Sequence, residues 1–167
     1  MRHTPRHMAP IAALAAAAGF VAGAAWTSRS AADAAMLPTK VAGWNDSAAG
    51  AVTAKWGELR WLHQGETPSL KDLHVGVVVV KPGEAVHKAH RHAEEEFIYI
   101  AEGSGTWRVD GKDMPLQKND TLYVSPWDFH GLTNTGKDPL TFFVVKWNGK
   151  AAAPPPHPGD GKPDEEK

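Results

Sequence analysis

The stretch HKAHRHAEEEFIYIAEGSG, residues 87–105, places three histidines and three consecutive glutamates directly before an apolar run of β-branched and aromatic residues. Ionisable side chains are costly to bury unless a partner or a metal ion compensates them. The apolar run itself is typical of a core strand. The sequence therefore predicts a strand that begins beside a cluster of ionisable groups, together with something that compensates them.

The remaining sequence indicates more strands of this kind. Leu73–Lys81, LHVGVVVVK, is a continuous valine-rich run, typical of a strand covered on both faces. Asp110-Gly111 is a turn pair that predicts a two-residue hairpin. Short strands with two buried faces predict an all-β sandwich or closed barrel over residues 55–148. The other predicted strands are Glu58–His63, Phe97–Ala101, Thr106–Val109, Lys112–Leu116, Thr121–Val124, His130–Thr133 and Leu140–Trp147.

The composition is that of a globular protein with one domain. The chain has 167 residues, of which 42% are hydrophobic and 22% are charged, and its formal net charge is −1. Its lysines and arginines form no basic stripe, which argues against a nucleic-acid partner. The chain contains no cysteine, so disulfides and thiolate ligands are excluded. Any metal must be held by nitrogen and oxygen atoms.

The first 34 residues have the layout of a secretory signal. Arg2 and Arg6 precede Ile11–Trp26, an alanine-rich apolar stretch without a charge, and Ala32-Asp33-Ala34 offers a cleavage site. The stretch is shorter than the roughly 20 apolar residues of a spanning helix, although an uncleaved membrane anchor is the alternative. We expect a mature chain that begins at Ala35, is periplasmic or secreted, and has no stable membrane insertion.

Two further segments flank the predicted barrel. Residues 35–54 form an N-terminal extension. Residues 149–167 are rich in proline, glycine and charge and show no hydrophobic period, so they cannot bury enough apolar surface to offset their conformational entropy. We expect this C-terminal tail to be disordered and His157 within it to be solvated.

The histidines at the head of the apolar run can share one ion. In a regular strand the side chains of His90 and His92 project to the same face, and Glu94 and Glu96 keep that parity, so alternation does not choose between the two glutamates. His130, which follows a proline-marked corner, is a further candidate. Imidazole and carboxylate ligands suit Fe, Mn, Zn, Ni or Cu, whose identity the ligands do not decide. The alternative is that His90 and His92 lie on an exposed strand and bind no metal.

Three other features have simpler interpretations. His87 lies three positions before His90 and therefore on the opposite face of a regular strand, which predicts a surface position. The tryptophans of the predicted domain suit core packing better than an aromatic ligand pocket. Asn134 is interpreted as a turn residue that fixes the strand carrying His130.

Two motifs in this region carry a family resemblance. The first, with histidines two apart, a glutamate four residues later and flanking glycines, resembles the first sequence motif of the cupins. The second, with a proline-marked turn before a histidine and an asparagine four residues beyond it, resembles their second motif. The family pattern is not matched at Asn119, at Asp128 or in the spacing after Gly83. These departures affect the shape of loops. The matching residues are Gly83, His90, His92, Glu96 and Gly103, then Asp120, Pro126, His130 and Asn134.

The resemblance implies a fold, a site and a range of activities. The implied fold is the cupin double-stranded β-helix, or jelly-roll, barrel. The implied metal ligands are His90, His92, Glu96 and His130, with Glu96 also available for proton transfer. We expect a metal-dependent oxygenase-type enzyme acting on a small organic substrate, and a homodimer. The alternatives are a non-catalytic small-molecule-binding cupin, or a cupin isomerase or decarboxylase.

Overall fold

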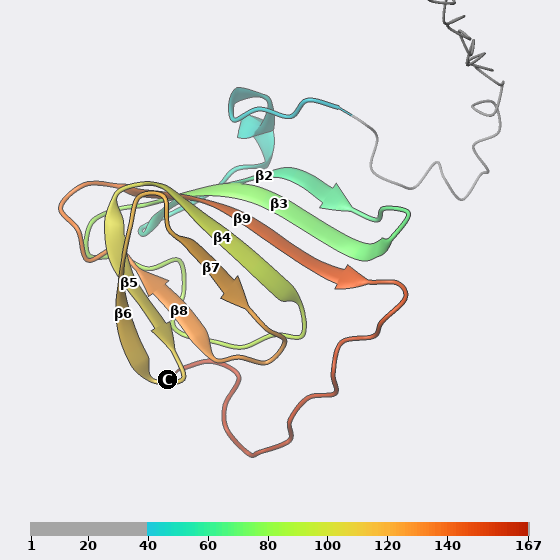
Figure 1. Cartoon of the computed structure of the whole chain (residues 1–167). Coiled ribbons are helices and arrows are strands. Elements are labelled where there is room, and N and C mark those ends of the chain that lie inside the picture. Colours follow the sequence, from blue (N-terminus) through green and yellow to red (C-terminus); the bar gives the residue numbers. More distant parts are fainter. Residues whose placement is uncertain (1–39, 167) are drawn as a thin grey trace, which may run out of the picture.

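The computed structural model describes residues 40–166, and nearly all of its regular structure is β (Figure 1). The predicted signal peptide and the start of the extension lie outside these residues. No helix within residues 40–166 is long and apolar enough to cross a membrane. The elements are a 3₁₀ helix, η2 (Asn45–Gly50), and the strands β1 (Val52–Ala54), β2 (Gly57–Gly65), β3 (Leu70–Val80), β4 (Glu95–Glu102), β5 (Ser104–Val109), β6 (Lys112–Gln117), β7 (Thr121–Val124), β8 (His130–Thr133) and β9 (Leu140–Gly149).

The strands form two antiparallel sheets that enclose one core. The larger sheet has the order β1-β2-β3-β9-β4-β7, and the smaller has the order β6-β5-β8. The described part of the N-terminal extension contributes η2 and β1, and β1 pairs with β2 at the edge of the larger sheet. This arrangement confirms the predicted all-β, jelly-roll fold. The core residues come from both sheets and include Val78, Val80, Ile98, Ile100, Trp107, Leu116, Leu132, Phe142 and Val144.

The turns between strands follow the local chemistry that the sequence predicts. Asp110 and Gly111 both have positive φ, 47° and 75°, which is the requirement of the tight hairpin between β5 and β6. Gly103 separates β4 from β5 with φ of 85°, and a Cβ there would lie 2.6 Å from the carbonyl oxygen of Pro139. These turns set the register that the inward-facing side chains require.

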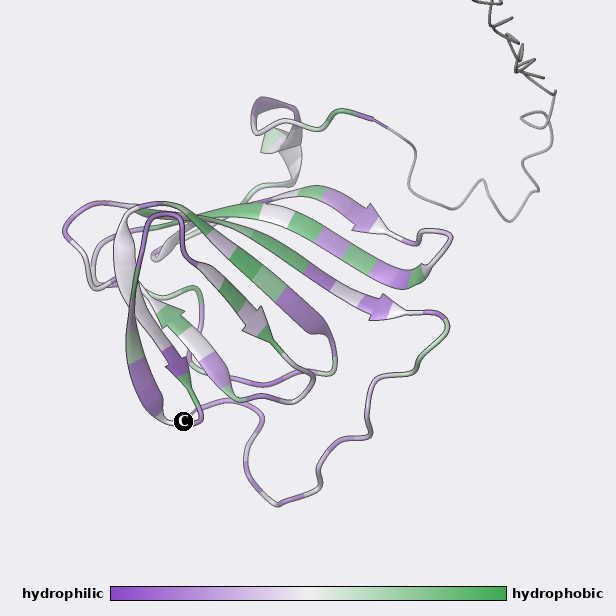
Figure 2. Cartoon of the chain, viewed as in Figure 1, coloured by the Kyte–Doolittle hydropathy of each residue, from purple (hydrophilic) through white to green (hydrophobic). Residues whose placement is uncertain are grey.

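Strand β4 directs alternate side chains into and out of the barrel. In Figure 2 the strand is hydrophilic at its start and mostly hydrophobic beyond it. Ile98 and Ile100 are buried, whereas Phe97 and Tyr99 are exposed on the outer face. Glu96 shares the inward parity and is buried at the start of the strand. The core strand therefore carries one carboxylate into the barrel.

The valine run in β3 is covered less completely than predicted. Val78 and Val80 are buried in the core, but Val77 and Val79, on the opposite face, are only partly buried. Valine favours strands because its branched side chain packs well on any pleated surface. A continuous valine run is therefore compatible with a sheet that has one core face and one half-open face.

The described part of the tail contacts the barrel, although its residues are exposed. After β9 the chain turns back and ends beside the smaller sheet (Figure 1). Arg91 is buried and forms ion pairs with Asp160 and Asp164 of the tail, which holds the pKa of Asp160 at about 2. His157 is exposed, as predicted, and its Nε2 lies 2.9 Å from a carboxylate oxygen of Asp164. A buried arginine needs such partners, and its acidic partners contribute to the polar composition of the tail.

Asn134 ties the turn after β8 to the core. Its side chain is 0% exposed. The amide nitrogen donates to the carbonyls of Val80 and Asp138, and the amide oxygen accepts from the Gly136 amide. These hydrogen bonds anchor the end of the strand that carries His130, in agreement with the interpretation from sequence.

Replacing Asn134 by alanine is expected to lower the free energy of unfolding by about 3 kcal/mol, because buried polar groups lose their partners. Urea unfolding of the parent and the variant measures the difference in their free energies of unfolding. Asn45→Ala, at an exposed position, is the matched control and should change stability by less than about 0.5 kcal/mol. A loss below about 1 kcal/mol for Asn134→Ala would contradict this role.

Candidate metal centre

The structure brings three of the predicted ligands together. His90 and His92 lie in the connection between β3 and β4, and His130 begins β8. Their candidate ligand atoms all lie within 4.8 Å of one another. The amides of His90 and His130 each donate to the other residue's carbonyl at 2.8 Å, which joins the connection to β8. The site is therefore assembled by backbone pairing between distant segments.

The prediction that His90 and His92 share a regular strand is wrong in detail. His90 forms only isolated antiparallel bridges, one to His130 and one to Glu165, and β4 begins after both histidines. The two imidazoles nevertheless face the same cluster, with ring centroids 5.2 Å apart. Their convergence comes from the bridge to β8 rather than from strand alternation.

Backbone carbonyls select the ring tautomers of two histidines. His130 Nδ1 lies 2.8 Å from the carbonyl oxygen of Asp128, and His92 Nδ1 lies 3.1 Å from that of Glu94. Because a carbonyl only accepts, Nδ1 carries the hydrogen in each contact. Each Nε2 is then left with a free lone pair, the arrangement found in metal-binding histidines.

The lone pairs need a cation. His92 Nε2 lies 3.2 Å from a carboxylate oxygen of Glu96, so in this tautomer two acceptors face each other unless a proton or a metal ion lies between them. In addition, His90 Nδ1 and His130 Nε2 are buried without a hydrogen-bond partner in the described structure. A proton on His92 would leave both of these nitrogens unsatisfied. A divalent transition metal suits the whole set of imidazoles and carboxylate.

The structure separates the two glutamates that alternation left equivalent. Glu96 is buried and faces Nε2 of His92. Glu94 is turned toward Lys146, with 3.6 Å between the charged groups, and toward Nδ1 of His92. Glu96 is therefore the carboxylate placed with the free lone pairs, as the family resemblance implies.

Burial favours the neutral, ligating form of the imidazoles. The pKa of His90 is lowered to about 3, mainly by burial and then by His87 and the other histidines. Burial also lowers the pKa of His130. Both rings are therefore neutral at neutral pH, so a metal ion does not have to displace a proton from them.

A cavity of about 280 Å³ opens beside the cluster. Its lining includes His90, Glu96 and His130, and its other walls come from both sheets. Trp107 belongs to the core and also lines this cavity, and the partly buried Trp61 lines it as well. The interpretation of the tryptophans as core packing is therefore incomplete. The further lining side chains include Leu59, Val78, Ile98, Leu132, Phe142 and Val144.

Sequence reasoning missed two residues of this cavity. Lys146 in β9 is the cross-strand neighbour of Glu96. It follows Phe142 and Val144 at every second position of the strand and therefore lies on the same inward face. A charged residue on the inward face of an otherwise apolar strand was a usable signal. His87 is exposed as predicted, but its ring centroid lies 4.0 Å from that of His90 and its side chain lines the cavity.

Comparison with known proteins agrees with the fold and the motifs. Residues 76–146 match the family model described as the cupin domain. The matched residues include all four predicted ligands. Among solved structures, the plu4264 protein from Photorhabdus luminescens is similar with a TM-score of 0.52 and 20% identity, over 68% of this chain and 89% of that chain. This similarity shows the fold alone.

The curated relatives include several activities. An oxalate-binding protein of Thermotoga maritima is 33% identical over 64 residues, 38% of this chain and 53% of that protein. A gentisate 1,2-dioxygenase of Streptomyces is 33% identical over 58 residues, 34% of this chain and 16% of that protein. The dimethylsulfoniopropionate lyase DddW of Ruegeria pomeroyi is 32% identical over 95 residues, 56% of this chain and 61% of that protein. Each match spans less than two thirds of the relative's length.

Glu96→Gln is expected to weaken Co²⁺ binding by at least about tenfold, because the substitution removes the charged oxygen that faces His92. Competition titration of the metal-free protein measures the dissociation constant. Glu94→Gln is the matched control, since it makes the same substitution two residues away and keeps the carbonyl that orients His92. Equal effects of the two substitutions would show that Glu96 is not the carboxylate ligand.

Proposed function

We propose that this protein is a mononuclear, metal-dependent cupin enzyme of the oxygenase type that acts on a small organic substrate. In this proposal His90, His92, Glu96 and His130 hold one divalent transition metal. The observation that carries it is the pair of buried imidazole nitrogens, on His90 and His130, that lack a partner in the described structure beside a small cavity. When bound, a divalent metal supplies Lewis acidity and, if redox-active, one-electron chemistry.

The cavity supports a small substrate with an apolar body and one acidic group. Its volume of about 280 Å³ lies at the lower end of the usual range for ligand pockets. Trp61, Trp107 and Phe142 provide flat apolar surface that excludes water. Lys146 provides the cationic group, and its pairing with Glu94 at 3.6 Å is loose enough to be exchanged for a substrate carboxylate.

The chain's own residues have separate roles in this proposal. His87 and Lys146 line the cavity beside the cluster and would bind and orient the polar end of the substrate. Glu96 would hold or accept a proton at its carboxylate oxygen near His92, since no other carboxylate lines the cavity among the described residues. Replacing Glu96 by glutamine would then abolish turnover of an identified substrate.

A non-catalytic small-molecule-binding cupin is the second candidate. The similarity to an oxalate-binding protein favours it. Isomerase or decarboxylase chemistry is a further alternative on the same site. Oxygen uptake by the metal-loaded protein separates the oxygenase from these alternatives.

We also propose that the protein is exported and forms a homodimer. The layout of residues 1–34 supports export. The outer face of the larger sheet supports self-association, because Phe97, Tyr99 and Tyr123 are 47%, 42% and 50% exposed on adjacent strands. Phe97 also packs against Tyr123 and Trp147, which makes the aromatic surface continuous.

The chain beginning at Ala35, purified without a histidine tag, is expected to contain about one equivalent of Fe, Mn, Ni, Cu or Zn, in keeping with a single set of ligands. Elemental mass spectrometry measures the content. His90→Ala/His92→Ala should lose the metal because it removes two ligands. A folded parent that contains no metal and rejects added divalent ions would rule out the metalloenzyme.

The metal-loaded protein is expected to consume oxygen with at least one member of a panel of flavonols, oxalate, β-diketones and small aromatic acids. An oxygen electrode measures uptake, and Glu96→Gln loaded with the same metal is the control. Turnover that is unchanged in this variant would exclude Glu96 from the proton transfer. Binding without uptake across the panel would favour the non-catalytic alternative.

A further inference from the structure

The segment that carries His90 and His92 is hydrogen-bonded on both sides. On one side His90 pairs with His130 of β8 through two backbone hydrogen bonds. On the other side the Arg91 amide donates to the Asp164 carbonyl at 2.8 Å, and the Glu166 amide donates to the Ala89 carbonyl at 2.7 Å. The end of the tail, which lies outside the matched residues 76–146, therefore pairs with the ligand segment through one antiparallel β-bridge, between Glu165 and His90.

The side chain of Arg91 fastens the tail to this segment. It is 4% exposed. Its guanidinium donates to Asp164 at 2.8 Å, to both oxygens of Asp160 at 3.1 and 3.3 Å, and to the Lys162 carbonyl at 2.8 Å. Charge-assisted, forked contacts of this kind fix orientation as well as proximity.

A second connection joins the tail to His92. The Trp127 amide donates to the His92 carbonyl at 2.7 Å, and the Trp127 indole donates to the Pro155 carbonyl at 2.7 Å. Trp127 has φ of 69°, a left-handed conformation that costs energy for a residue other than glycine. Its two hydrogen bonds and the edge contact of its ring with His157 hold this conformation.

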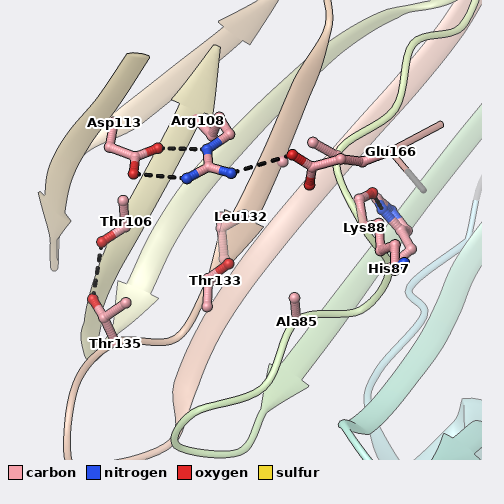
Figure 3. Close-up of a pocket in the computed structure, with 12 residues that line it drawn as sticks. Ala85, His87, Lys88, Thr106, Arg108, Asp113, Leu132, Thr133, Thr135 and Glu166 are labelled. Atoms are coloured by element: carbon pink, nitrogen blue, oxygen red, sulfur yellow. Dashed lines mark hydrogen bonds and ion pairs between the residues drawn. The ribbon is translucent and has the colours of Figure 1, made fainter. Parts of the chain in front are cut away.

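The end of the tail is also held beside the smaller sheet. Arg108 of β5 contacts Glu166 at 3.3 Å while it pairs with Asp113 at 2.6 Å, as Figure 3 shows. Glu166 also lines a surface pocket together with His87 and Lys88, which immediately precede the ligand segment in the sequence.

We propose that residues 155–166 form a strap that positions His90 and His92 for metal binding, and that Arg91, Asp160 and Asp164 are its positioning residues. The inference rests on the proposed metal site. Because the connection between β3 and β4 is otherwise irregular, the strap provides the second hydrogen-bonded edge that a ligand-bearing segment needs to stay rigid. The side-chain hydrogen bonds and ion pairs described for these three residues join them to one another and to other tail residues, not to His92, Glu96 or His130.

The test compares the parent with Asp160→Asn/Asp164→Asn in the chain beginning at Ala35. In the metal-free variant, amide hydrogen exchange at Arg91 and Glu166 should accelerate by roughly tenfold or more, while amides in β3 and β9 keep their rates. The Co²⁺ dissociation constant should rise by roughly tenfold, with a changed Co²⁺ absorption spectrum, because the ligands are less well oriented.

Glu66→Gln/Glu102→Gln is the matched control. It makes the same change in net charge and removes the exposed partners of Lys150 and Lys118, away from the site. Unchanged exchange at Arg91, or an equal acceleration in β3 and β9, would overturn the strap. Faster exchange with unchanged Co²⁺ affinity and spectrum would overturn the positioning role. A parent that binds no Co²⁺ would instead refute the metal site, and its exchange data would still decide whether the strap exists.

Discussion

The two backbone hydrogen bonds between His90 and His130 are the constraint on which the site depends. They join an irregular connection of the larger sheet to a strand of the smaller one, and they bring together imidazoles that are distant in the sequence. With His90 tied to β8, His92 lies across from Glu96 at the start of β4. The same bonds satisfy backbone groups in the interior, so the ligand segment needs no regular strand of its own.

The side chains at this junction have arrangements that a bound cation would explain together. Carbonyls of Asp128 and Glu94 hold the hydrogens of two imidazoles on Nδ1, which leaves their Nε2 lone pairs free. Burial keeps His90 and His130 neutral. A carboxylate beside lone pairs is unfavourable without a cation, whereas with a divalent metal each of these features becomes favourable. The cavity beside them has imidazoles and a carboxylate at one end, apolar walls and a lysine.

The tail makes contacts that its composition does not indicate. Its prolines, glycines and charges lack a hydrophobic period, so a rule based on apolar burial predicts disorder. The described contacts use a different driving force, a buried arginine that needs acidic partners. Arg91 lies between two predicted ligands, and nothing in its local sequence indicates that its partners are about 70 residues further along the chain. The pairing depends on the path of the chain after β9.

The sequence by itself determined the approximate positions of β2 to β9, the hairpin at Asp110-Gly111 and the all-β class, and the resemblance of two motifs to the cupins implied the four candidate ligands. These features depend on local patterns of hydropathy, turn residues and spacing, which are visible in one dimension. Only the tertiary structure decided that Glu96 faces the lone pairs while Glu94 faces Lys146, that His87 and Lys146 line the cavity, and that the tail pairs with Arg91. The reason is physical: those outcomes depend on which distant segments share a hydrogen-bonded edge, and strand alternation carries no information about that choice.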